Sequence, residues 1–152
     1  MSDAYDRERS VALQAVRAAA TLCQSVRATM DGDVLEKDDR TPVTVADFGS
    51  QALVCEALRT AFPDDPVIGE EDSSALRADE NAAVRTRVVD QVRAHHPGAT
   101  PEDVFEWIDH GTARDYADRY WTVDPIDGTK GFVRGDQYAI ALALVIDGTP
   151  QV

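Results

Sequence analysis

The chain has 152 residues, 43% of them hydrophobic, which is enough to bury one core, so we expect a single domain over residues 1–152. Its 28 acidic and 15 basic residues give a formal charge of -13, which argues against nucleic-acid polymers and anionic membrane surfaces as partners. The charged N-terminus lacks a signal-peptide pattern, and no apolar run approaches the roughly 18 residues of a membrane span, so the sequence predicts a cytoplasmic protein.

The first part of the sequence predicts two helices joined by a polar loop. From Tyr5 to Met30, apolar residues recur every three or four positions, the spacing of an amphipathic helix, and residues 31–33 break it. The loop covers residues 36–42. The second helix should end before Pro63, and its apolar face is Phe48, Ala52, Cys55, Leu58 and Phe62. Because Cys23 and Cys55 fall within these two apolar patterns, we expect buried free thiols.

The middle of the sequence predicts one short strand and two further helices. Val67-Ile68 lies between a proline turn and an acidic run, which is typical of a brief buried strand. Residues 74–96 have valines at a spacing of four and predict one helix. Thr100 and Pro101 then provide the cap and first residue of another helix, which continues to Asp109.

The last part of the sequence predicts strands. Residues 120–124 form one, and residues 137–147 form a longer one, with bulky residues on one face and alanines on the other. Asp147-Gly148 predicts a hairpin turn into a return strand. Because the partner for this apolar strand is missing, we expect the chain to be the front part of a longer protein.

Two carboxylates in Asp124-Pro-Ile-Asp127 are the first candidates for chemistry. Pro125 fixes a bend that aims both side chains and a carbonyl at one point, where like charges raise a pKa unless a cation intervenes. Hard divalent ions take oxygen ligands, so Mg²⁺ fits this set better than zinc. The amides of Gly128 and Thr129 would suit a phosphate oxygen. The alternative for the short motif is an Asx-type turn that caps a helix.

Two further acidic motifs allow a structural or a functional interpretation. Glu70-Glu71, directly after the predicted strand, is either a solvated acidic turn or a set of ligands. Thr44-Val-Ala-Asp47 has the pattern of a capping box, with the threonine as the cap and the acid three residues later. An acid in the first turn of a helix would also be rigidly placed for catalysis.

Taken in order, three motifs resemble those of the inositol-monophosphatase-like superfamily: residues 41–47 (TPVTVAD), residues 69–72 (GEED) and residues 121–132 (WTVDPIDGTKGF). Lys130-Gly131, where inositol monophosphatases typically have Thr-Asn, makes the third motif most similar to the 3′(2′),5′-bisphosphate nucleotidases. The resemblance implies an α+β fold, the N-terminal half of a layered α/β/α/β/α sugar-phosphatase fold with a largely antiparallel sheet and flanking helices.

The resemblance also implies roles for individual residues. Glu70, Asp124, Asp127 and the carbonyl of Ile126 would bind two or more Mg²⁺ ions. Asp47 and Thr129 would orient and deprotonate the attacking water, and Gly128 and Thr129 would bind the substrate phosphate. Bound cations would also explain how so acidic a chain holds a phosphate ester.

Three hypotheses of function follow from these motifs. The first is hydrolysis of 3′-phosphoadenosine 5′-phosphate, a small phosphorylated nucleotide, to AMP and phosphate. The second is an inositol or other sugar phosphatase, and the third is a non-catalytic fragment that binds a metal or a partner. The sequence predicts neither the number of ions nor the oligomeric state.

Overall fold

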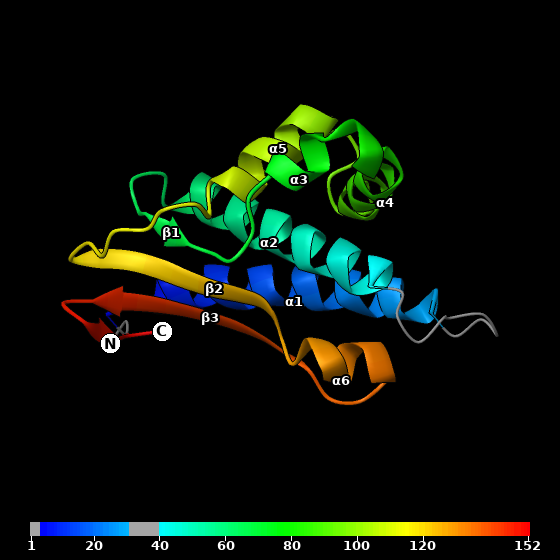
Figure 1. The fold of residues 1–152 in the computed structure, drawn as a ribbon. Coiled ribbons are helices and arrows are strands. Elements are labelled where there is room, and N and C mark those ends of the chain that lie inside the picture. The colour runs from blue at the N-terminus through cyan, green and yellow to red at the C-terminus, as the bar shows by residue number, and fades with distance from the viewer. Residues whose placement is uncertain (1–3, 31–39) are drawn as a thin grey trace.

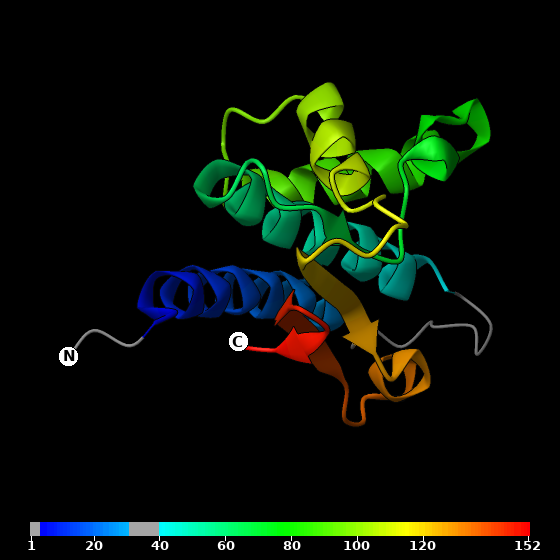
Figure 2. The same cartoon turned by 90° about the vertical axis from the view of Figure 1, so that its left-hand side faces the viewer.

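The computed structural model describes residues 4–30 and 40–152, which form a mixed arrangement of helices and one sheet. Two long helices, α1 (Asp6–Ala28) and α2 (Thr41–Ala61), lie side by side, and they cover one face of the sheet (Figure 1). The shorter helices α4 (Ala82–Arg93) and α5 (Pro101–Asp109) pack on α2 from its other side, as Figure 2 also shows. Helix α2 therefore lies between two layers of the protein.

The sheet has four strands in the order β1-β2-β3-β4. They are β1 (Val67–Ile68), β2 (Arg119–Asp127), β3 (Ala139–Ile146) and β4 (Thr149–Pro150). Strand β1 runs parallel to β2, and the other two pairs are antiparallel. The prediction of an α+β fold with a largely antiparallel sheet is confirmed. No helix in the described ranges is both long and apolar enough to cross a membrane.

Trp121 is the largest side chain of the core between the sheet and the long helices. It is fully buried and stacks on Phe62 at the end of α2, with 5.6 Å between ring centroids. Its indole N–H donates to Asp65 at 3.0 Å, and Arg119 donates to the same carboxylate. Because the indole N–H has a partner, the ring is buried without the cost of an unsatisfied donor. These contacts fix β2 against α2.

Several predicted elements are confirmed with small changes of boundary. The predicted buried face of α2 is buried, and both cysteines are buried and free. Thr100 caps α5 through a complete capping box with Asp103. The hairpin turn has φ of 48° at Asp147 and 74° at Gly148, and the return strand after it is β4. The predicted break at residues 31–33 lies outside the described residues, as does most of the predicted loop.

Two predictions about helices are wrong. Helix α2 begins at Thr41 and not at Thr44, so Thr41 and Pro42 belong to the helix; the hydroxyl of Thr44 donates to the carbonyl of Arg40 at 2.9 Å instead of capping. The segment 74–96 is not one helix. It forms α3 (Ser74–Arg77), a 3-10 turn and α4, because the backbone of Ala78 is extended, with ψ of 137°.

The short helix α6 (Thr129–Arg134) depends on a close approach at Gly131. A Cβ atom at this position would lie 2.0 Å from the backbone carbonyl oxygen of Gln137. The carbonyl of Gly131 also accepts a 2.7 Å hydrogen bond from the amide of Asp136. The chain after α6 can therefore fold back this closely onto the helix because residue 131 has no side chain.

We predict that Gly131→Ala lowers the free energy of unfolding by about 1–3 kcal/mol, because the backbone must shift to admit the methyl group. Chemical denaturation of the two proteins measures the difference. Gly98→Ala is the matched control, since a Cβ there would meet nothing within 4 Å. Equal stability of wild type and Gly131→Ala would contradict the close approach.

Candidate active site

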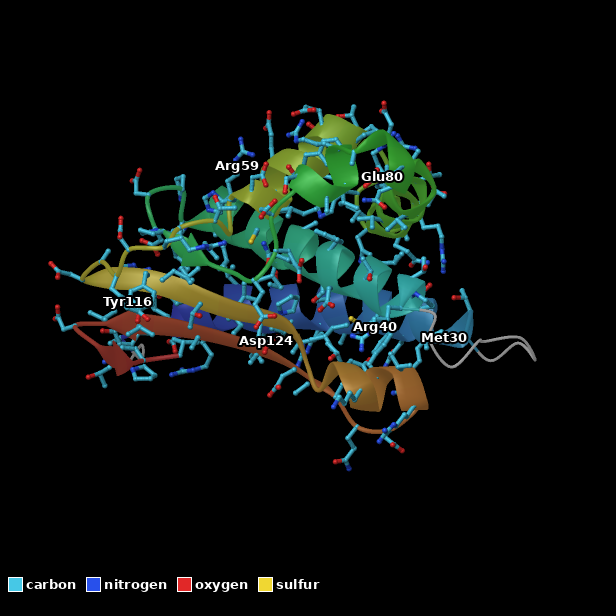
Figure 3. The ribbon with its side chains drawn as sticks, viewed as in Figure 1. Met30, Arg40, Arg59, Glu80, Tyr116 and Asp124 are labelled. Carbon is cyan, nitrogen blue, oxygen red and sulfur yellow. The ribbon has the colours of Figure 1, made fainter. Side chains whose placement is uncertain are left out.

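The predicted acidic residues come from three elements that meet beside the middle of the sheet. Asp47 lies on α2, Glu70 follows β1, and Asp124 lies on β2, where Figure 3 labels it. Strands β1 and β2 pair in parallel, with Ile68 opposite Thr122. Two residues beyond this pair, Glu70 follows β1 and Asp124 lies on β2, and the charge of Asp124 contributes to the raised pKa of Glu70. Parallel pairing thus places Glu70 next to Asp124.

The local backbone of β2 differs from the turn that the sequence predicts. The strand does not end at Asp124; it continues to Asp127, with a shift of register between these two residues. The reason is that β1 pairs only with Trp121 and Thr122, so Pro125 removes no hydrogen bond from that pair of strands. The hydroxyl of Ser50 on α2 donates to the carbonyl of Pro125 at 3.1 Å. The irregular segment is therefore held from the helix.

Burial and neighbouring acids raise the pKa of these carboxylates. Burial, followed by the charges of Glu71, Glu70 and Asp124, raises the pKa of Asp47 to about 8. Burial and the neighbouring Asp124 and Asp127 raise the pKa of Glu70, while burial and Asp127 raise that of Asp124. Both burial and like charge oppose ionisation, so this group of acids favours a proton or a cation.

Two oxygen atoms of this group lack partners. Asp47 Oδ1 and Asp124 Oδ1 are buried and have no hydrogen-bond partner within the described parts of the chain. A buried carboxylate oxygen without a partner is costly, and a hard divalent cation is one group that would satisfy it. The atoms nearby that could bind a cation are oxygens, and they include the carbonyl oxygen of the buried residue Ile126. Oxygen ligands fit Mg²⁺.

The arrangement does not amount to a formed metal site. Over residues 4–30 and 40–152, no group of three or more His, Cys, Asp or Glu side chains is placed so that it could hold a metal ion. Asp127 is exposed at the end of β2, while Asp47 is half-buried. Mutual repulsion opposes a tighter grouping of ionised carboxylates. The ligand set of Glu70, Asp124, Ile126 and Asp127 stays a prediction.

Gly128 and Thr129 stand at the N-terminus of α6, as the sequence predicts for a helix start. Gly128 has φ of 88°, and its carbonyl accepts the amide of Phe132 at 3.0 Å. The three amides before Phe132 precede the first bond of the helix. Phosphate binding by Gly128 and Thr129, and a catalytic role of Thr129 with Asp47, stay predictions.

Sequence reasoning missed Ser50 and Gln51 beside this site, and it gave Glu71 no role separate from that of Glu70. Glu71 is half-buried and contributes more than Glu70 to the raised pKa of Asp47. Ser50 and Gln51 are fully buried polar side chains on α2. A signal for the last two existed, because polar residues interrupt an otherwise apolar helix just after Asp47.

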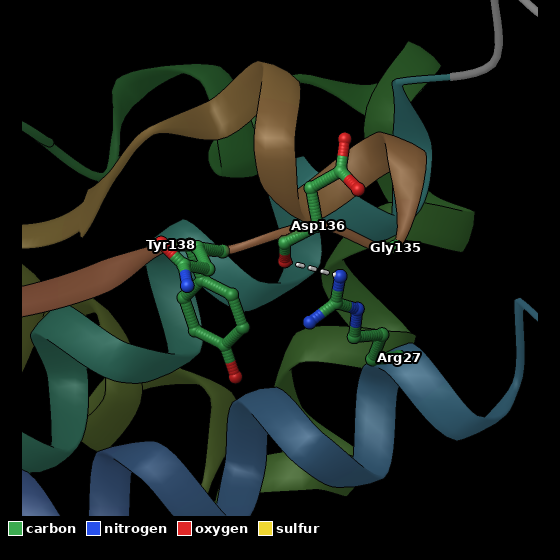
Figure 4. Close-up of a pocket in the computed structure, with 5 residues that line it drawn as sticks. Arg27, Gly135, Asp136 and Tyr138 are labelled. Carbon is green, nitrogen blue, oxygen red and sulfur yellow. Dashed lines mark hydrogen bonds between the residues drawn. The ribbon is translucent and has the colours of Figure 1, made fainter.

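A separate pocket lies between α1 and the connection from α6 to β3. It has a volume of about 780 Å³ and is lined by Arg27, Gly135, Asp136, Gln137 and Tyr138 (Figure 4). The Arg27 guanidinium donates to the carbonyl of Asp136 at 2.6 Å and lies over the Tyr138 ring. None of the predicted site residues lines this pocket. We assign Arg27 a structural role, because its contacts anchor the connection from α6 to β3.

Comparison with known proteins assigns the chain to a family. Residues 5–152 match the Inositol monophosphatase family. The chain belongs to this family. Its match covers almost the whole chain, and it includes all three motifs from which the resemblance was inferred, so that inference is confirmed.

Three similar proteins are named as 3′(2′),5′-bisphosphate nucleotidases. The chain is 43% identical to the 3′(2′),5′-bisphosphate nucleotidase of Schizosaccharomyces pombe, over 97% of this chain and 46% of the relative. It is 40% identical to that of Emericella nidulans, over 97% and 45%, and 42% identical to 3′(2′),5′-bisphosphate nucleotidase 1 of Arabidopsis thaliana, over 95% and 44%. The chain thus spans about half the length of these relatives.

The raised pKa of Asp47 predicts how the metal-free protein responds to pH. Its folded pKa of about 8 lies above the ordinary value of 3.8, so the associated stability is present at acidic pH and is lost as pH rises through 8. We expect Asp47→Asn to lose less stability than wild type across this range, since it carries no proton to release. Denaturation at a series of pH values in a chelator measures this.

Asp90→Asn is the control for that experiment, because Asp90 is an exposed acid on α4. Its stability should depend on pH as wild type does. The assignment would be wrong if Asp47→Asn and wild type lost equal stability between acidic pH and pH 8.

Proposed function

We propose that this chain is the metal-binding part of a Mg²⁺-dependent phosphatase that converts 3′-phosphoadenosine 5′-phosphate to AMP and phosphate. The observation that carries the proposal is the group of partly buried carboxylates with two unpartnered oxygens, on Asp47 and Asp124, in a chain of the Inositol monophosphatase family. The family makes phosphate-ester hydrolysis the expected reaction. The names of the similar nucleotidases support the choice of substrate.

In this proposal Glu70, Asp124, Asp127 and the carbonyl of Ile126 hold Mg²⁺. The bound ions supply a lowered pKa for water and positive charge for the phosphate oxygens. Because the chain is strongly acidic, bound cations would supply the positive charge that holds the substrate phosphate. No covalent intermediate on the protein is required.

The remaining roles fall to residues of the chain itself. Asp47, in its ionised form, accepts a proton from the attacking water. Thr129 orients that water, and the amides at the start of α6 bind a phosphate oxygen. These assignments rest on the resemblance of the motifs and on the position of each residue.

Phosphate release is the direct test of the reaction and the substrate. We expect Mg²⁺-dependent release from 3′-phosphoadenosine 5′-phosphate, at a higher kcat/KM than from inositol 1-phosphate, and loss of activity in a chelator. The assay uses the 152-residue chain and, in parallel, a longer protein that contains it. Preference for the inositol ester would reject the nucleotide substrate, and no metal-dependent release from either ester would reject the phosphatase.

Asp127→Asn tests the ligand assignment. We expect activity to fall by about 100-fold or more, because a ligand to the ions is lost, while the free energy of unfolding does not fall, since Asp127 is exposed and its charge repels Glu70 and Asp124. Asp115→Asn removes the same charge from an exposed position outside the acidic group and should keep full activity. Near-normal turnover of Asp127→Asn at saturating Mg²⁺ would contradict the assignment.

A further inference from the structure

Gln51 is fully buried on α2, four residues after Asp47, and its side chain uses both ends of its amide. The oxygen Oε1 accepts the backbone amides of Glu70 at 3.1 Å and Glu71 at 2.9 Å. The nitrogen Nε2 donates to the carbonyls of Glu71 at 2.7 Å and Ile108 at 2.9 Å. One uncharged side chain therefore satisfies four backbone groups in two other segments.

The contacts are concentrated on the segment that carries the predicted ligand Glu70. Three of the four hydrogen bonds go to Glu70 and Glu71, and the fourth goes to the end of α5. A Cβ atom on Gly69 would lie 2.6 Å from Oε1, so the backbone reaches the amide only because residue 69 is glycine. The segment after β1 is thus fastened to the helix through Gln51.

The residue before Gln51 contacts the other acidic segment. The hydroxyl of Ser50 donates to the carbonyl of Pro125, between Asp124 and Ile126. Neighbouring side chains of α2 therefore hold the segment of Glu70 and the segment of Asp124, which repel each other in the absence of a cation. A fixed separation lowers the cost of bringing the carboxylates together when an ion binds.

We propose that Gln51 is a positioning residue, which holds the Glu70–Glu71 segment against the helix of Asp47 and thereby sets the affinity of the site for divalent cations. The part that concerns affinity rests on the proposed function. The amide touches no ion and takes no part in proton transfer. It acts through the backbone of residues 70 and 71, and its loss frees the carboxylate of Glu70 from its place beside Asp124.

Gln51→Met tests the proposal, because methionine has a similar length and lacks both ends of the amide. In the metal-free protein, we expect hydrogen exchange at the amides of Glu70 and Glu71 to become at least about tenfold faster, while amides of the β2–β3 ladder keep their rates. Calorimetric titration with Mn²⁺ should give roughly 10–100-fold weaker binding than wild type. Neither measurement depends on turnover.

Two further variants separate positioning from general loss of stability. Gly69→Ala keeps the Gln51 amide chemically intact but places a methyl group 2.6 Å from its oxygen, so the amide and the segment must move apart and Mn²⁺ binding should weaken in the same direction. Thr100→Ala removes the capping box of α5 without touching residues 70 and 71. It should therefore keep the exchange rates at these two amides and the wild-type affinity for Mn²⁺.

The outcomes distinguish this proposal from the proposed function. Unchanged exchange at Glu70 and Glu71 in Gln51→Met would overturn the positioning role, and faster exchange with wild-type affinity would overturn the link to the ions. If wild type binds no Mn²⁺, the proposed function and that link both fail. Faster local exchange in Gln51→Met would still establish that Gln51 holds the segment.

Discussion

The central constraint of this structure is a group of acidic side chains placed close together beside helix α2. Asp47, Glu70, Glu71 and Asp124 lie on or beside three elements, and burial and neighbouring acids raise the pKa of each. Asp47 and Asp124 each have a buried oxygen without a hydrogen-bond partner among the described residues. Such a grouping costs folding free energy, because burial and like charge both disfavour the ionised forms. Clusters of acids with raised pKa values are characteristic of sites that bind an ion or move a proton.

Helix α2 is what makes this grouping possible. It packs against α1 and β2 on one side and against α4 and α5 on the other, so its position is fixed by contacts in every direction. The same helix carries Asp47 and, one turn later, the buried amide and hydroxyl that reach the two acidic segments. The site is therefore built on a rigid element, and the irregular backbone of the segments takes its position from it.

Local sequence patterns predicted most of the elements and the identity of the acidic residues. Each of the short motifs around Asp47, Glu70 and Asp124 alone also allowed a structural role, and these residues were assigned to a site because the three motifs together resemble those of a family. Gln51 was missed because its partners lie 20 and 57 positions away, which no periodicity records. The capping role of Thr44 failed because Thr41 and Pro42 start the helix earlier. Strand β2 can continue past Pro125 because β1 no longer pairs with it there. Local sequence does not show where this pairing between distant segments ends.

The most direct test of the central claim is the effect of Mg²⁺ on the melting temperature of the metal-free chain, with NaCl at the same ionic strength as the reference. Salt alone screens repulsion in a chain of charge -13, so only the excess effect of Mg²⁺ reports binding to the folded state. We predict an increase with Mg²⁺ beyond that with NaCl, which Asp124→Asn abolishes. Equal melting temperatures in the two salts would contradict a site for divalent cations among these carboxylates.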